Sequence, residues 1–427
     1  MSEIRNKQPG IRFKGFSGEW QKKYLGDIIE GLYNGQTPSR FKDEFWKGDI
    51  NWLTSGELNR SIVTSTIEKI TFAGQSDANL RIVPKNTFVM AITGLEAAGT
   101  RGNCGILDIN TTLNQSCMAI FVDPKRLTTY FLFQWYNTVS DIYGLRYTQG
   151  TKQQSYNAEI IKKLDISLPN VKEQTKIGDF FQNLDQAISL NQSKYDKLLN
   201  IKKACLEKMF PKEGATTPEV RFKGFSEEWE EHSLGEVAAY TKGFAFKSNE
   251  YKDYGTRIIR VSDLSEDSVS EKVEKIYTDI NIKNANFYSA YIIKYADIII
   301  TTVGSKAELR ESAVGRPIFI NKNKSYLLNQ NLVKLSPYNN YYSQFLYGQL
   351  LRSCYSQYIS NIQRGNANQA NITIYDLWLY TFKVPTLNEQ TQIGNFFKHL
   401  DQLISLRKTQ LDKLKNIKKA CLDKMFV

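Results

Sequence analysis

Two stretches of the chain carry apolar residues at alternating steps of four and three. In residues 173–210 this pattern begins at Ile177, and the stretch contains no proline. Residues 389–426 repeat the pattern from Ile393. A period of 3.5 residues is typical of helices that pair through one apolar face. We therefore predict two long helices, each extending up to about 57 Å at 1.5 Å per residue.

The two predicted helices are expected to pair with each other in antiparallel orientation. Polar residues interrupt both apolar faces, at Asn191 and Lys202 and at Arg407 and Lys418, and such interruptions can set the register of a coiled coil. The alternative is that each helix packs only on its own domain. The residues predicted to form the pairing surface are Ile177, Phe181, Leu184, Ile188, Leu198, Cys205, Ile393, Phe397, Leu400, Ile404, Leu411, Leu414 and Cys421.

The long-helix stretches belong to an internal duplication. Residues 168–210 align without gaps to residues 384–426, with 27 identities in 43 positions. The segment IRFKGFSGEW at residues 11–20 returns as VRFKGFSEEW at residues 220–229. Between these repeats the halves diverge, although short echoes such as LNQS and LNQN keep their order. A fixed order of repeated segments indicates two structurally equivalent halves.

The divergent regions are predicted to be mixed α/β. Short β-rich runs such as CMAIFV and YADIIITTV favour strands, and TTYFLFQWYNTVSDIYGLR and YYSQFLYGQLLRSCYSQYI favour aromatic-rich helices. We expect two pseudo-twofold-related α/β domains separated by two long antiparallel coiled-coil helices. The expected boundaries are 1–168 for the first domain, 169–211 for the first helix, 212–383 for the second domain and 384–427 for the second helix.

Composition narrows the class of protein. The formal charge is +12, from 56 Lys+Arg and 44 Asp+Glu, which favours a polyanionic partner. The five cysteines form no C-x-x-C pair, which favours reduced thiols over a disulfide framework. No apolar run approaches the length that crosses a bilayer, and the first residues do not read as a signal peptide. We expect a cytoplasmic protein without a membrane partner.

The usual signatures of catalysis are missing from the sequence. It contains no Walker-type phosphate loop and no Pro-Pro dipeptide, which adenine methyltransferases carry before an aromatic residue. The only histidines, His232 and His399, occupy different positions in the two halves, so histidine catalysis or zinc ligation is not expected. Cys205 and Cys421 lie on the apolar faces, where packing explains them better than redox chemistry. We expect neither an enzyme nor a metal site in this chain.

This layout resembles the specificity (S) subunit of type I restriction–modification systems over essentially the whole chain. The resemblance rests on the order of variable and repeated regions and on P-x-x-x-E-Q at 169–174 and 385–390. The I-G-x-F-F-x-x-L-D-x-x-I core follows each of these motifs, and F-K-G-F-S-x-E-W precedes each variable region.

The resemblance implies two target-recognition domains, each reading one half of a bipartite, asymmetric double-stranded DNA target. It implies that the helices set the spacing between the half-targets and dock two modification subunits, which methylate adenine N6 from S-adenosylmethionine. Restriction subunits, which translocate DNA with ATP and cut it, would join them. This chain would then carry no cofactor of its own, with S-adenosylmethionine, ATP and Mg²⁺ on the partner subunits.

Base reading requires arginine, lysine, amide or hydroxyl side chains on exposed loops. In the first domain the candidates are Gln36, Thr37, Ser39, Arg40, Arg101, Asn103, Gln149, Lys152, Gln153 and Gln154. In the second domain they are Lys242, Lys247, Ser248, Ser305, Lys306, Arg310, Arg316, Gln363, Arg364, Asn366, Asn368 and Gln369. Each of these residues could instead belong to an ordinary polar turn.

Several further residues have two interpretations. The aromatic residues Tyr33, Phe41, Trp46, Phe244 and Phe246 could stack on bases, but core packing is the simpler role. The repeated tryptophans of the F-K-G-F-S-x-E-W motifs are expected to be structural. The lysine-rich ends of the long helices either contact phosphates or form a solvated face.

Two other functions compete with DNA recognition. One is a coiled-coil protein-interaction scaffold that does not read DNA, and the other is a single-chain methyltransferase, which the absent Pro-Pro motif disfavours. An adenine methyltransferase gene next to this one would support the first hypothesis.

Overall fold

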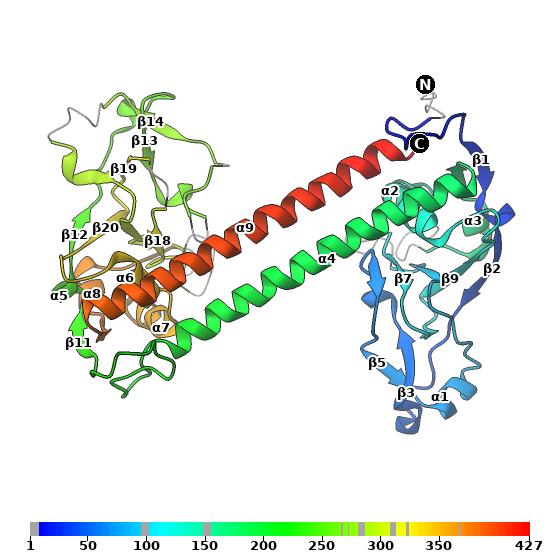
Figure 1. Ribbon diagram of the computed structural model, residues 1–427, viewed down its shortest axis with the longest axis horizontal. Coiled ribbons are helices and arrows are strands. Elements are labelled where there is room, and N and C mark those ends of the chain that lie inside the picture. Colours follow the sequence, from blue (N-terminus) through cyan, green and yellow to red (C-terminus); the bar gives the residue numbers. More distant parts are fainter. Residues whose placement is uncertain are drawn as a thin grey trace. The chain divides into compact units, whose positions relative to one another are not determined.

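The computed structural model describes residues 8–94, 102–147, 155–265, 268–271, 273–280, 287–307, 313–321, 324–366 and 369–427 (Figure 1). The chain divides into two compact units, one formed by Met1–Gln192 with Thr409–Val427 and the other by Ser193–Lys408. Each unit therefore contains one α/β domain and one part of each long helix. Of the helices in the described part of the chain, none combines the length and the apolarity that crossing a bilayer requires.

The first domain is mixed α/β, as predicted. Its strands are β1 (Gln21–Tyr24), β2 (Ile29–Asn34), β3 (Trp46–Leu53), β4 (Ser61–Val63), β5 (Glu68–Ile70), β6 (Phe88–Ala91), β7 (Cys104–Leu107), β8 (Thr112–Leu113), β9 (Cys117–Val122) and β10 (Asp165–Leu168). Its helices are α1 (Phe72–Asp77), α2 (Thr129–Tyr147) and α3 (Ala158–Lys162), with 3-10 turns η1 (Leu25–Asp27), η2 (Asp43–Phe45) and η3 (Ser55–Glu57).

The first domain is built on a main sheet and a smaller second sheet. The main sheet has the strand order β2-β9-β6-β7-β4, and the second has β5-β3-β8. All four residues of β6 are buried, as expected for a central strand covered on both faces. Phe88 of β6 packs against α2, with its ring centroid 5.6 Å from that of Tyr136 and 6.4 Å from that of Phe133.

The second domain has equivalent elements. Its strands are β11 (Glu230–Ser233), β12 (Ala238–Lys242), β13 (Thr256–Ile259), β14 (Ile276–Thr278), β15 (Ile292–Ile293), β16 (Ile298–Thr301), β17 (Val303–Gly304), β18 (Pro317–Phe319), β19 (Tyr326–Leu328), β20 (Leu332–Pro337), β21 (Arg364–Asn366), β22 (Gln369–Asn371) and β23 (Thr381–Val384). Its helices are α5 (Leu234–Val237), α6 (Ser343–Leu350), α7 (Ser353–Ile362) and α8 (Ile374–Trp378), with 3-10 turns η4 (Ser248–Glu250), η5 (Val261–Asp263) and η6 (Ser289–Tyr291).

The two domains share one topology. The order β12-β20-β16-β18 of the second main sheet matches β2-β9-β6-β7 of the first. The parallel pair β13 and β19 matches the parallel pair β3 and β8, and β11 pairs with β23 as β1 pairs with β10. The weak sequence echoes between the halves therefore mark equivalent strands.

One predicted helix of the second domain is two helices. The chain is extended at Arg352, with φ −76° and ψ 155°, between α6 and α7. The Arg352 guanidinium donates to the carbonyl of Pro211 at 2.7 Å and lies 5.3 Å from the ring centroid of Phe210. The arginine is thus held by the residues that follow the first long helix, at the point where the helical run is interrupted.

The long helices are α4 (Val171–Lys208) and α9 (Leu387–Met425). In the first unit Asp185 pairs with Lys418 at 2.6 Å, and Lys415 donates to Gln192 at 3.2 Å. Later positions of α4 thus meet earlier positions of α9, so the two segments are antiparallel. In the second unit the equivalent pair, Asp401 with Lys202, is also separated by 2.6 Å.

The alternative in which each long helix packs only on its own domain is wrong. Cys421 and Met425 of α9 join the core of the first domain, together with Ile177 and Phe181 of α4. Cys205 packs against the core of the second domain, where burial raises the pKa of its thiol. All five cysteines are free thiols. None of the predicted pairing residues is exposed; which of them make the pairing contact stays a prediction.

The repeated arginine and glutamate residues form the same ion pair in both units. The Arg12 guanidinium donates to both carboxylate oxygens of Glu173 at 2.7 Å. Arg221 does the same to Glu389 at 2.8 Å. Glu173 and Glu389 are 0% and 1% exposed, and a carboxylate buried to this degree requires such a partner. The arginine that precedes each F-K-G-F-S motif thus pairs with the glutamate of the P-x-x-x-E-Q motif in the same unit.

The glutamine of each P-x-x-x-E-Q motif attaches the long helix to the domain that precedes it. Gln174 accepts from the backbone N–H of Thr128 at 3.0 Å and donates to the carbonyls of Arg126 and Pro169. Gln390 accepts from the N–H of Tyr342 at the same distance. Each side-chain amide thus satisfies backbone groups at the start of an aromatic-rich helix.

The repeated phenylalanine after each long helix completes a domain core. Phe426 lies 5.3 Å from Phe131 and 6.1 Å from Trp20, measured between ring centroids. Phe210 lies 5.5 Å from Phe345 in the second domain. Trp20 and Trp229 are 4% and 2% exposed, which confirms the structural role predicted for both tryptophans. Each core therefore takes an aromatic residue from the end of the long helix encoded by the other half.

Candidate nucleic-acid interface

One edge of the first main sheet gathers the predicted DNA-reading segments. Strands β2 and β6 both run antiparallel to β9, with Asn34 opposite Met118 and Ala91 opposite Cys117. Both strands therefore end where β9 begins, and β7 also begins there, with Cys104 opposite Met90. We call the segments 35–40, 92–94, 102–103 and 114–116 the first loop edge. It contains Gln36, Thr37, Ser39, Arg40 and Asn103.

The backbone of the first loop edge is fixed by local contacts. The N–H of Gln36 donates to the carbonyl of Leu113 at 3.0 Å, and the carbonyl of Gln36 accepts from Trp52 at 3.0 Å. A Cβ on Gly35 would lie 1.8 Å from the Leu113 oxygen, so only glycine fits this approach. The Gln36 side chain remains exposed, while Thr37 contacts the amide of Gln115. A rigid backbone with an exposed amide is suited to reading a base edge.

Arg40 is held by aromatic and acidic neighbours. Its guanidinium lies 3.8 Å from the ring centroid of Trp46 and makes two hydrogen bonds to Glu68, at 2.6 and 2.9 Å. Hydrogen bonding from Arg40 lowers the pKa of the Glu68 carboxyl. The Arg40 side chain is nevertheless 49% exposed, so its outer face is accessible to a phosphate or base. Half-buried Ser39 contributes its carbonyl, which accepts from Trp46 at 3.0 Å.

Core packing does not explain Phe41. Its exposed fraction is 100%, whereas Tyr33, Trp46, Phe244 and Phe246 all pack against cores. Phe41 lies between Arg40 and Lys42 in the segment that leads into η2 and β3. A fully exposed aromatic ring between two cations is the composition of a base-stacking or wedging element.

Of the remaining first-domain candidates, Asn103 lies at the same edge. It is half-buried, and its carbonyl accepts from Ala91 at 2.8 Å. The N–H of Tyr156 donates to the carbonyl of Ile92 at 2.9 Å, so Tyr156 also lies at this edge. Arg101, Gln149, Lys152, Gln153 and Gln154 lie outside the described residues.

The second main sheet gathers its candidates at the equivalent edge. Lys242 lies opposite Val333 and Thr301 opposite Leu332, so β12 and β16 both end where β20 begins. Arg316 directly precedes β18, and its N–H donates to the hydroxyl of Thr301 at 2.9 Å. We call the segments 243–248, 302–307, 313–316, 329–331 and 363–371, as far as they are described, together with Lys242, the second loop edge.

Two of the predicted second-domain segments touch each other. The small sheet β17-β22-β21 joins them, and the Gln363 side chain accepts from the N–H of Ala307 at 2.9 Å. The carbonyl of Ser305 accepts from Val314 at 2.9 Å, and Arg364 donates to Asp376 at 2.8 Å. Ser305, Lys306 and Arg316 are half-buried, whereas Arg364 and Gln369 are exposed; Asn366 lies in β21, and Arg310 and Asn368 lie outside the described residues.

The third second-domain segment presents exposed polar side chains. Lys242, Lys247 and Ser248 are exposed, and no ion pair of either lysine is present among the described residues. A Cβ on Gly243 would lie 1.8 Å from the carbonyl oxygen of Asn329, the same close approach as that of Gly35 to β8. The equivalent glycines bring different side chains to equivalent edges: an amide in the first domain and two lysines in the second.

The repeated L-N-Q motif also lies at the two loop edges, although it is not among the predicted site residues. Asn114 and Asn329 are 9% and 7% exposed, and their N–H groups donate to Leu53 and Ile259 respectively. The Gln115 carbonyl accepts from Asn34 at 2.8 Å. These residues link the second sheet of each domain to its loop edge. The sequence did contain a signal for this role, because L-N-Q is kept at equivalent positions in two regions that otherwise diverge.

The described residues contain no cluster of three or more histidine, cysteine, aspartate or glutamate side chains that could hold a metal ion. His399 is exposed, and half-buried His232 lies 3.6 Å from Glu230. The chemistry that both loop edges offer is hydrogen bonding and positive charge.

The chain is similar to proteins of one kind. A family model described as the type I restriction modification DNA specificity domain matches residues 17–200 and 226–416. The type I restriction enzyme MjaVIII specificity subunit of Methanocaldococcus jannaschii is 22% identical over 423 residues, which cover 94% of this chain and 90% of that protein. The EcoR124I/EcoR124II specificity subunit of Escherichia coli is 26% identical over 176 residues, or 41% of this chain and 43% of that protein.

A solved structure shares the fold. The S subunit of a type I restriction–modification system from M. genitalium has a TM-score of 0.69 at 16% identity, covering 98% of this chain and 99% of that chain. The two family matches take in most of the chain, one in each half. This chain therefore belongs to the type I restriction–modification DNA specificity family and is a specificity subunit with two recognition domains, the non-catalytic component of its system.

Proposed function

We propose that the two loop edges each read one half of a bipartite, asymmetric double-stranded DNA target. The observation that carries this proposal is the contrast within one repeated topology. The motifs that join each domain to the long helices are the same in both halves, but the side chains at the equivalent edges differ. The first edge presents Gln36 and Arg40, and the second presents Lys242, Lys247 and Arg364. Two domains that share a topology but carry different side chains at their loop edges are suited to two different half-targets.

The exposed side chains have the chemistry that such reading requires. An amide can make two hydrogen bonds to adenine, an arginine can do so to guanine, and lysines neutralise phosphates. The formal charge of +12 supports the phosphate contacts. We further propose that the long helices set the spacing between the half-targets.

The long helices also support the docking of two copies of one partner. The residues Asp196, Lys197, Asn200, Ile201 and Ala204 of α4 are exposed, and α9 repeats all five identically as Asp412, Lys413, Asn416, Ile417 and Ala420, also exposed. Pairing of the helices does not require identity on exposed positions. A surface that occurs identically on both helices can bind two copies of one protein.

We propose that these copies are two modification subunits, which methylate adenine N6, joined by restriction subunits. S-adenosylmethionine, ATP and Mg²⁺ would bind to those partners, and the assembly would act in the cytoplasm on DNA without a membrane partner. This chain would supply the sequence specificity alone.

The deciding experiment maps methylated adenines after the chain is combined with its modification subunit. Methylation confined to one two-part motif supports the proposal, whereas methylation without sequence preference supports a scaffold that does not read DNA. Replacing residues 216–380 with the same region of a relative is expected to change one half of the motif only. A change in both halves would contradict the assignment of one half-target to each domain.

A further inference from the structure

A second polar site lies in the second domain, away from the loop edge. It is a hollow of about 350 Å³ at the beginning of β13 and β19. The second loop edge lies at the other end of β19, roughly 10 Å away at 3.3 Å per residue. The residues lining the hollow are Gly255, Thr256, Arg257, Glu271, Lys275, Tyr277, Lys324, Ser325 and Tyr326.

The register of the sheet places three of these side chains on one face. Arg257 of β13 lies opposite Tyr277 of β14, and Tyr326 precedes Leu327, which lies opposite Ile258 in the parallel pair of β13 and β19. Further along this face, Ile259 and Leu328 enter an apolar core. The polar end of the face is therefore the part that opens into the hollow.

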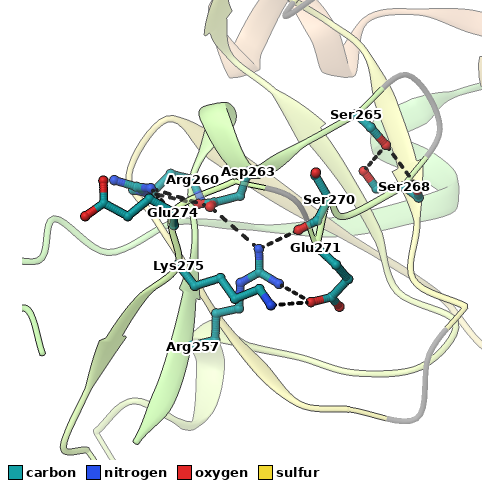
Figure 2. A network of polar contacts seen from close by, with 9 residues as sticks. All are labelled: Arg257, Arg260, Asp263, Ser265, Ser268, Ser270, Glu271, Glu274 and Lys275. Atoms are coloured by element: carbon teal, nitrogen blue, oxygen red, sulfur yellow. Dashed lines mark hydrogen bonds and ion pairs between the residues drawn. The ribbon is translucent and has the colours of Figure 1, made fainter. Parts of the chain in front are cut away.

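Arg257 is anchored from behind by a polar network (Figure 2). It is 6% exposed, donates to the carbonyl of Ser270 at 2.8 Å, and lies 3.6 Å from the buried carboxylate of Asp263. Its other terminal nitrogen lies 3.4 Å from Glu271, which also pairs with Lys275 at 3.0 Å. Asp263 fixes the guanidinium, and Glu271 bridges it to Lys275.

Two buried donors that line the hollow have no partner among the described residues. They are the Nε of Arg257 and the hydroxyl of Tyr326, whose residue is 4% exposed. Buried polar groups in folded proteins nearly always have a hydrogen-bond partner. The exposed ammonium of Lys324 also lacks an ion pair or hydrogen bond within the described part of the chain. Arg257, Tyr326 and Lys324, which all line the hollow, thus each have a donor without a protein partner among the described residues.

We propose that this hollow binds a phosphate group. Three cations, Arg257, Lys275 and Lys324, line it against one carboxylate, Glu271, so the ligand is an anion. The hydroxyls of Ser325 and the tyrosines add donors, and a phosphate has enough acceptor oxygens to use several of them at once. The phosphate comes either from a DNA backbone or from a free phosphate ion, and the chemistry of the site is the same for both.

The equivalent place in the first domain lacks these groups. Asn51 lies opposite Lys69 as Arg257 lies opposite Tyr277, and Thr111 precedes β8 where Tyr326 begins β19. The Asn51 amide donates to the carbonyl of Asn110 at 3.0 Å. This neutral side chain is therefore hydrogen-bonded within the domain and carries no charge for an anion. The phosphate site therefore belongs to the second domain alone.

The test titrates the full chain with inorganic phosphate against chloride at equal ionic strength, by calorimetry and by thermal denaturation. The variant Lys275→Gln/Lys324→Gln removes two charges that are partly or fully exposed, so folding is expected to persist. Tyr326→Phe removes only the buried hydroxyl. We expect the double variant to bind phosphate at least tenfold more weakly, and Tyr326→Phe to bind it severalfold more weakly. No phosphate binding by the unaltered chain, or equal binding by the double variant, would overturn the proposal.

DNA titrations identify the source of the phosphate and separate this site from the reading function. If the hollow takes a backbone phosphate, the double variant weakens target and non-target DNA equally and lowers the salt dependence by about one to two phosphates. If it takes free phosphate, DNA affinity does not change. Lys242→Gln/Lys247→Gln at the loop edge is the matched control and should retain phosphate binding. Failure of sequence-specific DNA binding would leave the phosphate measurement intact.

Discussion

Repeated and divergent residues occupy different places in this molecule. Glu173 and Glu389, identical in the two halves, are buried and paired to identical arginines. Gln36 lies just after β2, and Lys242 ends the equivalent strand β12; they differ in chemistry, and both are exposed. Identity between the halves thus coincides with buried contacts that define the fold and, on the long helices, with a repeated exposed surface. Difference coincides with side chains that point to solvent at one edge of each main sheet.

The comparison separates two kinds of constraint. Glycines 35 and 243 have little sequence around them in common, yet both allow the same close backbone approach to a neighbouring strand. Backbone geometry at the loop edges is therefore kept while side-chain chemistry changes. A protein organised in this way can change its target without changing its frame.

The largest expected effect is the loss of the repeated phenylalanines. Phe210→Ala should lower the free energy of unfolding of the second domain by about 3–5 kcal/mol, because the ring is 1% exposed inside its core. Phe426→Ala should destabilise the first domain by a smaller amount, since that side chain is partly buried. Hydrogen exchange measured peptide by peptide checks both. Loss of protection in the opposite domain would contradict the assignment of each phenylalanine to the core that it contacts.

The next effect concerns the buried ion pairs. Arg12→Ala should cost about 3 kcal/mol of stability, because it leaves the buried Glu173 carboxylate without its partner. Arg221→Ala should cost a similar amount, and urea denaturation of both variants gives the comparison. Arg12→Lys is the control that keeps the charge but not the paired hydrogen bonds. Unequal costs for the two arginines would mean that the halves are less equivalent than their contacts indicate.

Changes at the loop edges should affect recognition and leave stability unaltered. Gln36→Ala is expected to relax specificity in one half-target only, by about 1–3 kcal/mol of discrimination. Lys242→Ala/Lys247→Ala should weaken binding to all sequences and reduce the salt dependence. Methylation mapping and DNA titrations over a range of salt concentrations measure the two effects. A melting temperature lowered by either change would show that these residues also serve the fold.

Phe41 tests, at a single side chain, whether an exposed loop-edge residue serves recognition and not stability. Since it is fully exposed, Phe41→Ala should change stability by less than about 0.5 kcal/mol. If the ring stacks on a base, DNA affinity should fall by about 1–3 kcal/mol. Phe45→Ala, which truncates a buried neighbour, is the contrasting variant and should destabilise the domain. Unchanged DNA affinity for Phe41→Ala would remove this residue from the interface.

The smallest effect is expected for the ion pairs between the long helices. Exchanging the charges of Asp185 and Lys418 should change stability by about 1 kcal/mol or less, because both side chains are partly exposed. Each single reversal should cost more than the double exchange, and thermal denaturation of the three variants gives the coupling. The equivalent pair of Lys202 and Asp401 is the internal repeat of this measurement.

Periodicity and repetition carried most of the fold prediction, since a helix of almost forty residues leaves a pattern that short strands do not. The antiparallel pairing, the mixed α/β domains and the structural role of Trp20 all followed from patterns in the sequence. The arrangement of the loop edges could not be predicted in this way. It depends on pairings distant in sequence, such as Gly35 against Leu113, and local sequence does not encode these.

The environment of individual site residues could not be predicted from the sequence, for a related reason. Arg40 and Phe41 are adjacent, yet one is held on Trp46 and the other is fully exposed, and composition cannot distinguish them. Arg352, where the predicted helix is interrupted between α6 and α7, contacts Phe210, more than a hundred residues away. Such outcomes are decided by tertiary packing.

The order of synthesis gives the two domain cores different histories. Phe210 leaves the ribosome before any strand of the second domain, so that core can close as soon as its own chain is made. The first core is complete only when Met425 and Phe426 have been synthesised. At 5–20 residues per second, these residues are added roughly 10 to 40 seconds after Phe210. During that interval Trp20 and Phe131 lack the Phe426 ring that packs against them in the complete chain, and we expect this nascent domain to be the one that needs a chaperone.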